Sequence, residues 1–439
     1  MLQAHKTMIP VTRRKLLASI GALAPLAGSY KPKILSPIRT NSHIPRRSDV
    51  CFSARSARKE AAKVASEFYA TRLDWCYTSD PRFIHEMSAV GLKSIGGAIS
   101  PTISDAPGSG NYRAGRIKDR NGERLVAPWM RSQNPTNWGC VNNPIFKENF
   151  FNYATSMLKS GIDCIQWDDS LGNAHAVKWG GCWCQYCLTE ARHLGFDPVE
   201  DMMAFQTQST KHFILKMRNS INQWAGKIVN FSTNNYNGNK SNIYDLFDFW
   251  LGELTEDKAT PENVSVLLRS AEQANKQQIW TLRSSNIAHN RSMIAWCYAN
   301  GGHLLAPWDV YLEGVGNTSK RFYGEPSNFA DLYRFARSLG NFLDEANAAD
   351  FTRSILNSSD PNTHLSYRRQ IDSNFGIVHV VAWKANTTSI IEFQPKILLS
   401  NATRFRVRIP DKVGPWINVK QEREKIEVRA HPWSVIEIS

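Results

Sequence analysis

The sequence contains no nucleic-acid-binding motif and, after its first thirty residues, no long apolar run. We find no helix-turn-helix, zinc-finger or RNA-binding signature, and the Lys and Arg residues behind the formal net charge of +14 are dispersed along the chain. We therefore expect no nucleic-acid partner, whereas the positive charge favours acidic partners such as an anionic polysaccharide. No stretch after residue 30 reaches the roughly 18 apolar residues that span a bilayer, so we expect no membrane span there.

The first thirty residues have the charged, apolar and small-residue order of an export signal. Arg13 and Arg14 precede an apolar run over residues 16–27. The paired arginines resemble a twin-arginine signal, which exports proteins already folded. We expect residues 1–29 to be a removable signal, residues 30–60 to be an N-terminal linker, and the mature protein to be periplasmic or extracellular. An ordinary secretory signal or a membrane anchor is the alternative.

Between residues 72 and 310 short apolar runs alternate with amphipathic stretches, as in repeated βα units. This alternation predicts a closed (β/α)8 TIM barrel over residues 61–349. The alternative, an open doubly wound sheet, is disfavoured because the first unit has no Gly-rich phosphate loop. The eight predicted strands span residues 72–78, 92–100, 124–130, 162–168, 227–233, 247–254, 278–283 and 303–310.

From about residue 350 the pattern changes to alternation with a period of two and no helix between the runs. Such alternation is typical of antiparallel strands with one buried face. We therefore predict a small C-terminal antiparallel β-sandwich over residues 350–439. Its predicted strands span residues 366–370, 376–383, 389–393, 404–409, 425–430 and 433–438.

Four of the eight cysteines fall in two neighbouring loops of the predicted barrel. Cys182, Cys184 and Cys187 form a C-x-C-x-x-C run after the fourth predicted strand, and Cys140 follows the third. Because adjacent βα loops meet at the same barrel end, these thiols suit a tetrahedral zinc ion. Four thiolates leave no open position, so the zinc would be structural, and we expect no organic cofactor. A disulfide framework and unlinked thiols are the alternatives.

The cysteine pattern resembles that of family 42 glycoside hydrolases over roughly residues 129–192. The resemblance implies a (β/α)8 barrel with a structural zinc on the cluster. In that family an Asn-Glu pair ends strand four and the Glu is the acid/base, whereas this chain has Asp168-Asp169 there. The seventh predicted strand also lacks the family's nucleophilic Glu. The resemblance therefore implies the fold and the zinc site, but not the substrate or the catalytic assignment.

An Asp at the end of strand four, with a carboxylate two strands later, is similar to retaining α-glycosidases such as α-fucosidases and α-galactosidases, in which that Asp is the nucleophile. Glycoside cleavage needs one ionised and one protonated carboxyl group. We assign the nucleophile to Asp169, which occupies the catalytic position of the family 42 comparison, and an orienting or hydroxyl-binding role to Asp168. Glu253 follows a run with three aromatic residues, Phe247, Phe249 and Trp250, which favour its protonated form, and is the expected acid/base. A solvated loop glutamate is the alternative.

Other polar and aromatic residues at predicted strand ends are candidates for carbohydrate binding. An acidic residue beside a Trp suits hydroxyl recognition combined with ring stacking. The candidates are Asp74 and Trp75 after the first predicted strand, Asn234 after the fifth, Arg283 after the seventh, and Trp308 and Asp309 after the eighth.

The sequence therefore predicts a glycoside hydrolase that acts on an oligo- or polysaccharide. The main alternative is a barrel that binds glycans without turnover. A metal-dependent amidohydrolase is disfavoured because no His-x-His pair stands at the first predicted strand. A polysaccharide lyase would suit the positive charge, but no Lys, Tyr or His base can be placed.

Overall fold

The computed structural model describes residues 43–131, 136–308, 312–313, 320–321, 324–346, 348–350, 356–371, 374–383, 387–420 and 423–439. These residues belong to one compact unit, Thr40–Ser439. The predicted export signal, residues 1–29, lies outside the described residues, as does most of the predicted linker.

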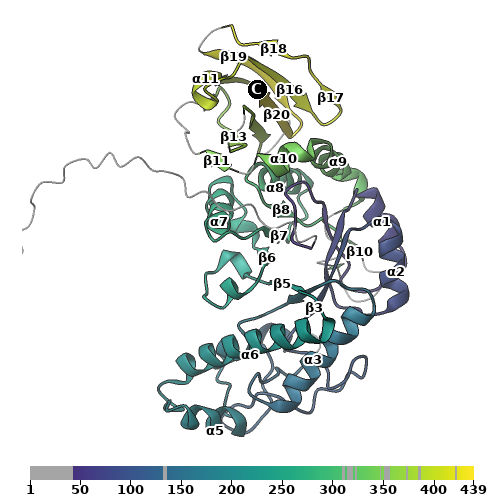
Figure 1. Cartoon of the computed structure of the whole chain (residues 1–439), viewed down its shortest axis with the longest axis vertical. Helices are drawn as coiled ribbons and strands as arrows, with labels where there is room; N and C mark the ends of the chain where they lie inside the picture. Colours follow the sequence, from purple (N-terminus) through teal and green to yellow (C-terminus); the bar gives the residue numbers. More distant parts are fainter. Residues whose placement is uncertain are drawn as a thin grey trace, which may run out of the picture. The chain divides into compact units, whose positions relative to one another are not determined.

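Eight parallel strands form a nearly closed barrel, which confirms the predicted fold class (Figure 1). Neighbours in sequence are neighbours in the sheet, from β1 to β8. The Ala306 N–H, just after β8, donates to Cys51 O of β1 at 2.8 Å and so links the two edge strands. The strands are β1 Cys51–Ser53, β2 Arg72–Cys76, β3 Ser94–Ile99, β4 Cys164–Trp167, β5 Asn230–Thr233, β6 Phe249–Leu254, β7 Gln278–Leu282 and β8 His303–Leu304.

The predicted set of barrel strands needs two corrections. The first barrel strand is β1, which lies in the segment predicted as linker and is too short for its periodicity to be recognised. Residues 124–130 form no barrel strand: they make isolated bridges, Lys118 with Arg124 and Val126 with Asn137, and end in a 3-10 helix. This run is apolar because Leu125 and Ala127 pack around the cysteine cluster. The two errors offset one another, so the fourth to eighth predicted strands keep their numbers.

Helices follow most of the strands. Three of them, α2, α3 and α7, begin at a proline, and the side chain of the preceding residue caps the helix: Asp80, Asn143 and Thr260, respectively. α3 and α6 lie side by side (Figure 1). The α-helices are α1 Ala61–Glu67, α2 Pro81–Ala89, α3 Pro144–Lys159, α4 Gly172–Val177, α5 Gln185–His193, α6 Met202–Ala225, α7 Pro261–Gln273, α8 Ile287–Ala299, α9 Ala330–Leu339, α10 Asn341–Glu345 and α11 Pro395–Leu398. The 3-10 helices are η1 Pro128–Met130, η2 Tyr236–Gly238, η3 Tyr244–Leu246, η4 Glu256–Lys258 and η5 Pro326–Asn328.

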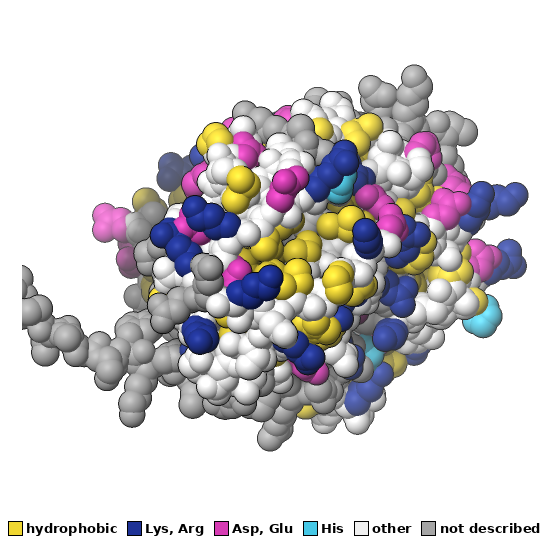
Figure 2. Space-filling view, turned by 90° about the horizontal axis from the view of Figure 1, so that it is seen from above, with side chains coloured by type: hydrophobic (Ala, Val, Ile, Leu, Met, Phe, Trp, Pro, Cys, Tyr) yellow, Lys and Arg dark blue, Asp and Glu magenta, His cyan; other side chains and the backbone are white. Residues whose placement is uncertain are grey.

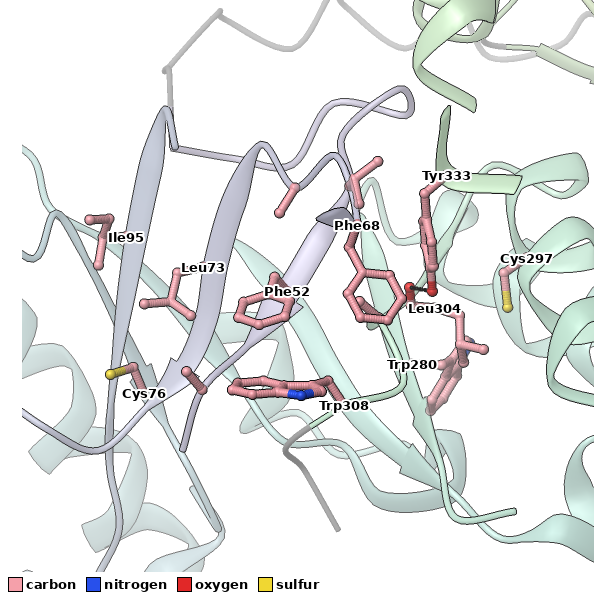
Figure 3. Packing of buried hydrophobic residues seen from close by; sticks show 14 of the residues in the cluster. Phe52, Phe68, Leu73, Cys76, Ile95, Trp280, Cys297, Leu304, Trp308 and Tyr333 are labelled. Atoms are coloured by element: carbon pink, nitrogen blue, oxygen red, sulfur yellow. Dashed lines mark hydrogen bonds between the residues drawn. The ribbon is translucent and has the colours of Figure 1, made fainter. Parts of the chain in front are cut away.

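The apolar core has two layers around the barrel wall. Inside the barrel, Trp75, Phe249, Leu251 and Ile279 pack together. Outside it, a larger cluster joins the strands to the helices, and Figure 3 shows Phe52 beside Trp308 in this layer. Their ring centroids are 5.2 Å apart. The barrel interior is therefore filled with side chains, and the strand ends remain as the place for a site.

The C-terminal strands form two antiparallel sheets around a separate apolar cluster, which confirms the predicted β-sandwich. Tyr298 of α8 stacks on Trp433 with centroids 5.7 Å apart, and the Ser366 hydroxyl donates to Ala299 O at 2.9 Å. The sandwich thus packs on α8. One sheet contains β11 Ala348–Asp350, β13 Thr363–Arg369, β14 Gly376–Ala382, β20 Trp433–Ile438, β16 Arg404–Ile409, β17 Lys412–Val413 and β18 Ile417–Asn418; the other contains β12 Leu356–Ser358, β15 Thr387–Phe393 and β19 Glu424–Ala430. A separate hairpin pairs β9 Leu312–Glu313 with β10 Lys320–Arg321.

The surface in Figure 2 carries Lys and Arg side chains spread among acidic, apolar and neutral ones. On this face the positive charge is distributed rather than gathered in one patch. Within the described part of the chain, no helix combines the length and hydrophobicity that a membrane crossing requires.

Candidate active site

The β4 strand ends in the two aspartates, and the backbone turns between them. The Asp168 N–H still donates to Ile99 O of β3 at 2.9 Å, so Asp168 continues the strand. Asp169 has a φ of 54°, a left-handed conformation that ends the strand direction. At the end of β2, Trp75 has a φ of 60° beside a register shift. Such conformations cost about 1–3 kcal/mol and concentrate at functional sites.

The Asp168 carboxylate is buried and accepts two hydrogen bonds. Tyr77 donates its hydroxyl to Oδ2, and Asn234 Nδ2 donates to Oδ1 at 3.0 Å. Tyr77 in turn accepts from Trp75 Nε1 at 3.0 Å. Burial and the negative charge of Asp168 raise the pKa of Tyr77 well above its usual value, so the phenol remains a donor. Both bonds stabilise the ionised form of Asp168.

Asn234 joins the β4 carboxylate to the carboxylate of β6. Its Nδ2 also donates to Glu253 Oε1, at 3.2 Å. Because one nitrogen contacts both groups, these two oxygens lie no more than about 6 Å apart, close to the roughly 5–5.5 Å of retaining glycosidases and short of the about 6.5–9.5 Å of inverting ones. Glu253 is half-buried.

Asp169 differs from Asp168 in its surroundings. Burial, followed by the charges of Asp168 and Glu253, raises its pKa well above the usual value, and Arg55 opposes this shift only in part. Among the described residues, none donates a hydrogen bond to its carboxyl group. The surroundings of Asp169 therefore favour its protonated form.

The sequence prediction missed two residues of this group, Arg55 and Tyr77. The Arg55 guanidinium lies 5.1 Å from the Tyr77 ring centroid, and its Nη2 donates to the hydroxyl at 3.4 Å. Burial lowers the pKa of Arg55, but Tyr77, Asp168 and Glu253 outweigh it and raise the value overall. Arg55 was missed because β1 was not recognised. Tyr77 carried a signal, since it is two residues from Trp75 on the same predicted strand.

Asn234 is the predicted binding residue that the structure places against the carboxylates. Asp74 is buried in the barrel and paired with Arg72, Nε to Oδ2 at 2.7 Å and Nη2 to Oδ1 at 2.8 Å. Trp75 and Trp308 are 1% and 0% exposed, so neither ring offers a face to a sugar in this structure. Arg283 is exposed after β7. Asp309 lies outside the described residues.

The predicted cysteine cluster assembles beside α4. Cys140 Sγ lies 3.5 Å from Cys184 Sγ and 3.4 Å from Cys187 Sγ, and no disulfide is formed. Zinc with four sulfur ligands at about 2.3 Å needs sulfurs roughly 3.8 Å apart. Cys182 donates to Asn173 O at 3.5 Å and also contacts Cys187. Hydrogen bonds from Cys140, then Cys187, lower the pKa of Cys184 to about 3. Three sulfurs, those of Cys140, Cys184 and Cys187, lie within 4.8 Å of one another and fit a metal site, whereas Cys182 lies outside this group.

Amide donors surround these sulfurs and connect them to the loop that follows β4. Asn142 Nδ2 donates to Cys187 Sγ at 3.4 Å, and Asn173 Nδ2 lies 3.6 Å from both Cys140 and Cys187 Sγ. Asn173 belongs to α4, whose first residue, Gly172, donates its N–H to Asp169 O at 3.0 Å. The cluster therefore braces the loop that follows β4.

No protein-family model matches the chain, and no curated protein matches it in sequence. Among solved structures, it is similar to the cycloisomaltooligosaccharide glucanotransferase of Paenibacillus sp., solved with cycloisomaltoheptaose, with a TM-score of 0.59 and 9% identity over 89% of this chain and 85% of that one. It is also similar to the gamma-CGTase of alkalophilic Bacillus clarkii, with a TM-score of 0.55 and 12% identity over 91% of this chain and 71% of that one. For the family 27 β-L-arabinopyranosidase of Geobacillus stearothermophilus, the TM-score is 0.50 and the identity 9% over 89% of this chain and 96% of that one. At these identities the similarity shows the fold, a (β/α)8 barrel followed by β-sheet structure, and the resemblance to family 42 stays a prediction.

Proposed function

We propose that the protein is a glycoside hydrolase that cleaves O-glycosidic bonds of an oligo- or polysaccharide. The observation that supports this most directly is the Asn234 amide, which donates to both Asp168 and Glu253. Two carboxyl groups held this close at C-terminal strand ends suit a retaining mechanism. The three similar structures, which are named as carbohydrate-active enzymes, share the fold that would present such a pair.

Within this proposal, Asp168 is the nucleophile and Glu253 the acid/base. This differs from the sequence prediction, which gave the nucleophile to Asp169. Two hydrogen bonds orient the Asp168 carboxylate, whereas Asp169 has no such bond, and burial with the charges of Asp168 and Glu253 raises its pKa. In its protonated form Asp169 would supply an O–H that can donate to a sugar hydroxyl.

The reaction follows from these roles. The Asp168 carboxylate attacks the anomeric carbon while the Glu253 carboxyl group gives its proton to the glycosidic oxygen, so the bond to the leaving sugar breaks and a glycosyl ester forms. Glu253, now ionised, takes a proton from water, and the hydroxide cleaves the ester with net retention of configuration. Arg55 interacts electrostatically with both carboxyl groups and would balance the negative charge of the site during both steps.

The cysteine cluster supports a structural zinc in this proposal. Cys140, Cys184 and Cys187, whose sulfurs cluster, would hold the ion, with Cys182 as the fourth ligand. The metal would brace α4 and, through Gly172, the backbone of Asp169. Because the four sulfurs would complete a tetrahedral shell, the zinc would not activate water.

The surface beside the cluster favours a substrate with negative charge. A hollow of about 690 Å³ is lined by Arg113, Lys118 and Arg124, with Glu123 as the acidic residue of its lining. These three cations are exposed. Together with the net charge of +14, they would attract an acidic polysaccharide. We further propose that the enzyme is exported to the periplasm or outside the cell, where such polymers are found.

The test is hydrolysis of aryl glycosides and of neutral and acidic polysaccharides by the mature protein. We expect turnover by the wild type and a loss of several orders of magnitude in Asp168→Asn and Glu253→Gln, with Glu262→Gln of α7 as the matched control. The anomer of the first product, read by NMR, checks retention. A mechanism-based fluoroglycoside should label Asp168; labelling of Asp169 would restore the original assignment.

The second candidate function, glycan binding without turnover, is favoured by the strong shielding of Asp168, which is only 6% exposed. Under this function wild type, Asp168→Asn and Glu253→Gln would all bind the same polysaccharide in affinity gels, and none would release sugar.

A further inference from the structure

Four aromatic rings gather beside the loop that follows β4, and we call them the aromatic platform. They are Trp129 of η1, Trp138, His175 of α4 and Trp179. The centroids of Trp129 and Trp179 lie 5.0 Å apart at 89°, and those of Trp138 and Trp179 lie 4.9 Å apart at 87°. His175 packs 4.5 Å from Trp179 and 5.7 Å from Trp129. Edge-to-face contacts of this kind stabilise a fixed arrangement of rings.

One ring of the platform is buried and hydrogen-bonded, and another is exposed to solvent. Trp138 is fully buried, and its Nε1 donates to Gly172 O at 3.2 Å. Trp129 is 48% exposed, although it contacts Trp138, Trp179 and His175. A single exposed aromatic residue is ordinary on a protein surface. An exposed indole fixed by three other rings is different, because its orientation is set before any ligand arrives and little side-chain entropy is lost on binding.

The platform is joined to the loop that carries Asp169. His175 and Trp179 follow Asp169 in this loop, after the start of α4 at Gly172. Trp138 donates to Gly172 O at 3.2 Å, and the Gly172 N–H donates to Asp169 O at 3.0 Å. A carbohydrate chain with one sugar ring at Asp168 could therefore extend over the platform with another ring.

We propose that the aromatic platform is a subsite that binds a sugar ring of an extended carbohydrate chain, away from the bond that is cleaved. The inference rests on the proposed function and adds that the substrate is a polymer or long oligosaccharide. Trp129 supplies an apolar face for the C–H groups of a pyranose ring, and the ring of His175 supplies a polar edge for its hydroxyls.

The properties of His175 suit this role. Burial, with the neighbouring charge of Lys178, lowers its pKa to about 4, so the imidazole is neutral at ordinary pH. A neutral imidazole has one donor and one acceptor nitrogen, and a sugar hydroxyl can use either. Binding to the platform should therefore depend little on the protonation of His175 between about pH 5 and 8.

The experiment is affinity electrophoresis in native gels that contain dextran, starch, xylan or polygalacturonate, with the wild type, Trp129→Ala and a control. The control is Trp224→Ala, because Trp224 on α6 is a comparably exposed indole, at 42%. We expect the wild type to be retarded in at least one gel, Trp129→Ala to lose most of this retardation, at least tenfold in Kd, and Trp224→Ala to match the wild type. Trp129→Phe should recover part of the binding, and thermal melting checks that each variant is folded.

The outcomes separate this inference from the proposed function. Loss of binding in Trp129→Ala with no hydrolysis by any variant would support the platform and contradict the glycosidase. Hydrolysis of an aryl monoglycoside with unchanged kcat/KM in Trp129→Ala, together with a raised KM for the polymer, supports both. Equal retardation of wild type and Trp129→Ala overturns the platform, as does a wild type that no gel retards.

Discussion

Tyr77, from the segment after β2, donates its hydroxyl to the carboxylate of Asp168 at the end of β4. The two residues are distant in the sequence, and the order of the barrel strands brings them together. The bond links the carboxylate, through Tyr77, to Trp75 and Arg55. A residue with no direct part in the reaction thus controls the geometry of the proposed nucleophile.

Tyr77→Phe should lower kcat/KM about 10- to 100-fold, because a hydrogen bond to a charged group contributes about 1.5–3 kcal/mol. We expect the change mainly in kcat, measured on the best substrate of the panel. Tyr69→Phe, at an exposed position after α1, is the control. An unchanged kcat in Tyr77→Phe would remove Tyr77 from the site.

Asp169→Asn should make the protein more stable near neutral pH. The folded-state pKa of Asp169 is raised, so the folded protein binds a proton that the unfolded chain has released, and its stability falls as pH rises through this window. The substitution removes that loss. Urea unfolding at several pH values should show a gain over the wild type at pH 7 that shrinks toward pH 4, with exposed Asp245→Asn as control. A stability difference that does not vary with pH would contradict the raised pKa.

Asp74→Ala should destabilise the fold rather than weaken substrate binding. Arg72 would remain buried without its partner, and breaking such a pair costs about 3–5 kcal/mol. Urea unfolding measures the loss. The double variant Arg72→Met/Asp74→Leu should recover much of it, because it leaves no buried charge unpaired. A stable Asp74→Ala protein with a greatly raised KM would instead support the original substrate-binding prediction.

Zinc analysis tests the cysteine cluster. We expect about one zinc ion per chain by plasma mass spectrometry, and near-total loss of metal together with a lower Tm in Cys187→Ser. Cys297→Ala is the control, because its thiol is also buried but lies on α8, outside the cluster. Full zinc content in Cys187→Ser, or none in the wild type, would contradict the site.

The sequence predicted the elements whose pattern is local. Continuous apolar runs identified β2, β3 and β4 to β8, and alternation identified the sandwich strands. β1 is only three residues long and is defined by its pairing with β2 and by the Ala306 bond, both of which are long-range. Residues 124–130 were wrongly predicted as a barrel strand, because an apolar run that packs around a cysteine cluster has the same sequence pattern as a buried strand.

The site shows the same division. Strand-end carboxylates and the cysteine spacing are visible in one dimension, so Asp168, Asp169, Glu253 and the four cysteines could be named as candidates, and their roles stay predictions. Which of the two aspartates accepts hydrogen bonds depends on Tyr77 and Asn234, which follow other strands. Asp74 was predicted to bind substrate because the sequence does not show that it pairs with Arg72. The two residues are two positions apart and share one face of the strand.

The sulfur contacts of Cys140 also have a consequence for the order in which the chain folds. They join positions 44 and 47 residues apart in sequence, and closing a loop of that length costs an unfolded chain roughly 3–4 kcal/mol in entropy. A metal bound there would offset this cost early and would tie the β3 and β4 units into one cooperative segment. With the metal bound, the loop that carries Asp168 and Asp169 would be harder to open locally, and release of the metal would make its opening easier.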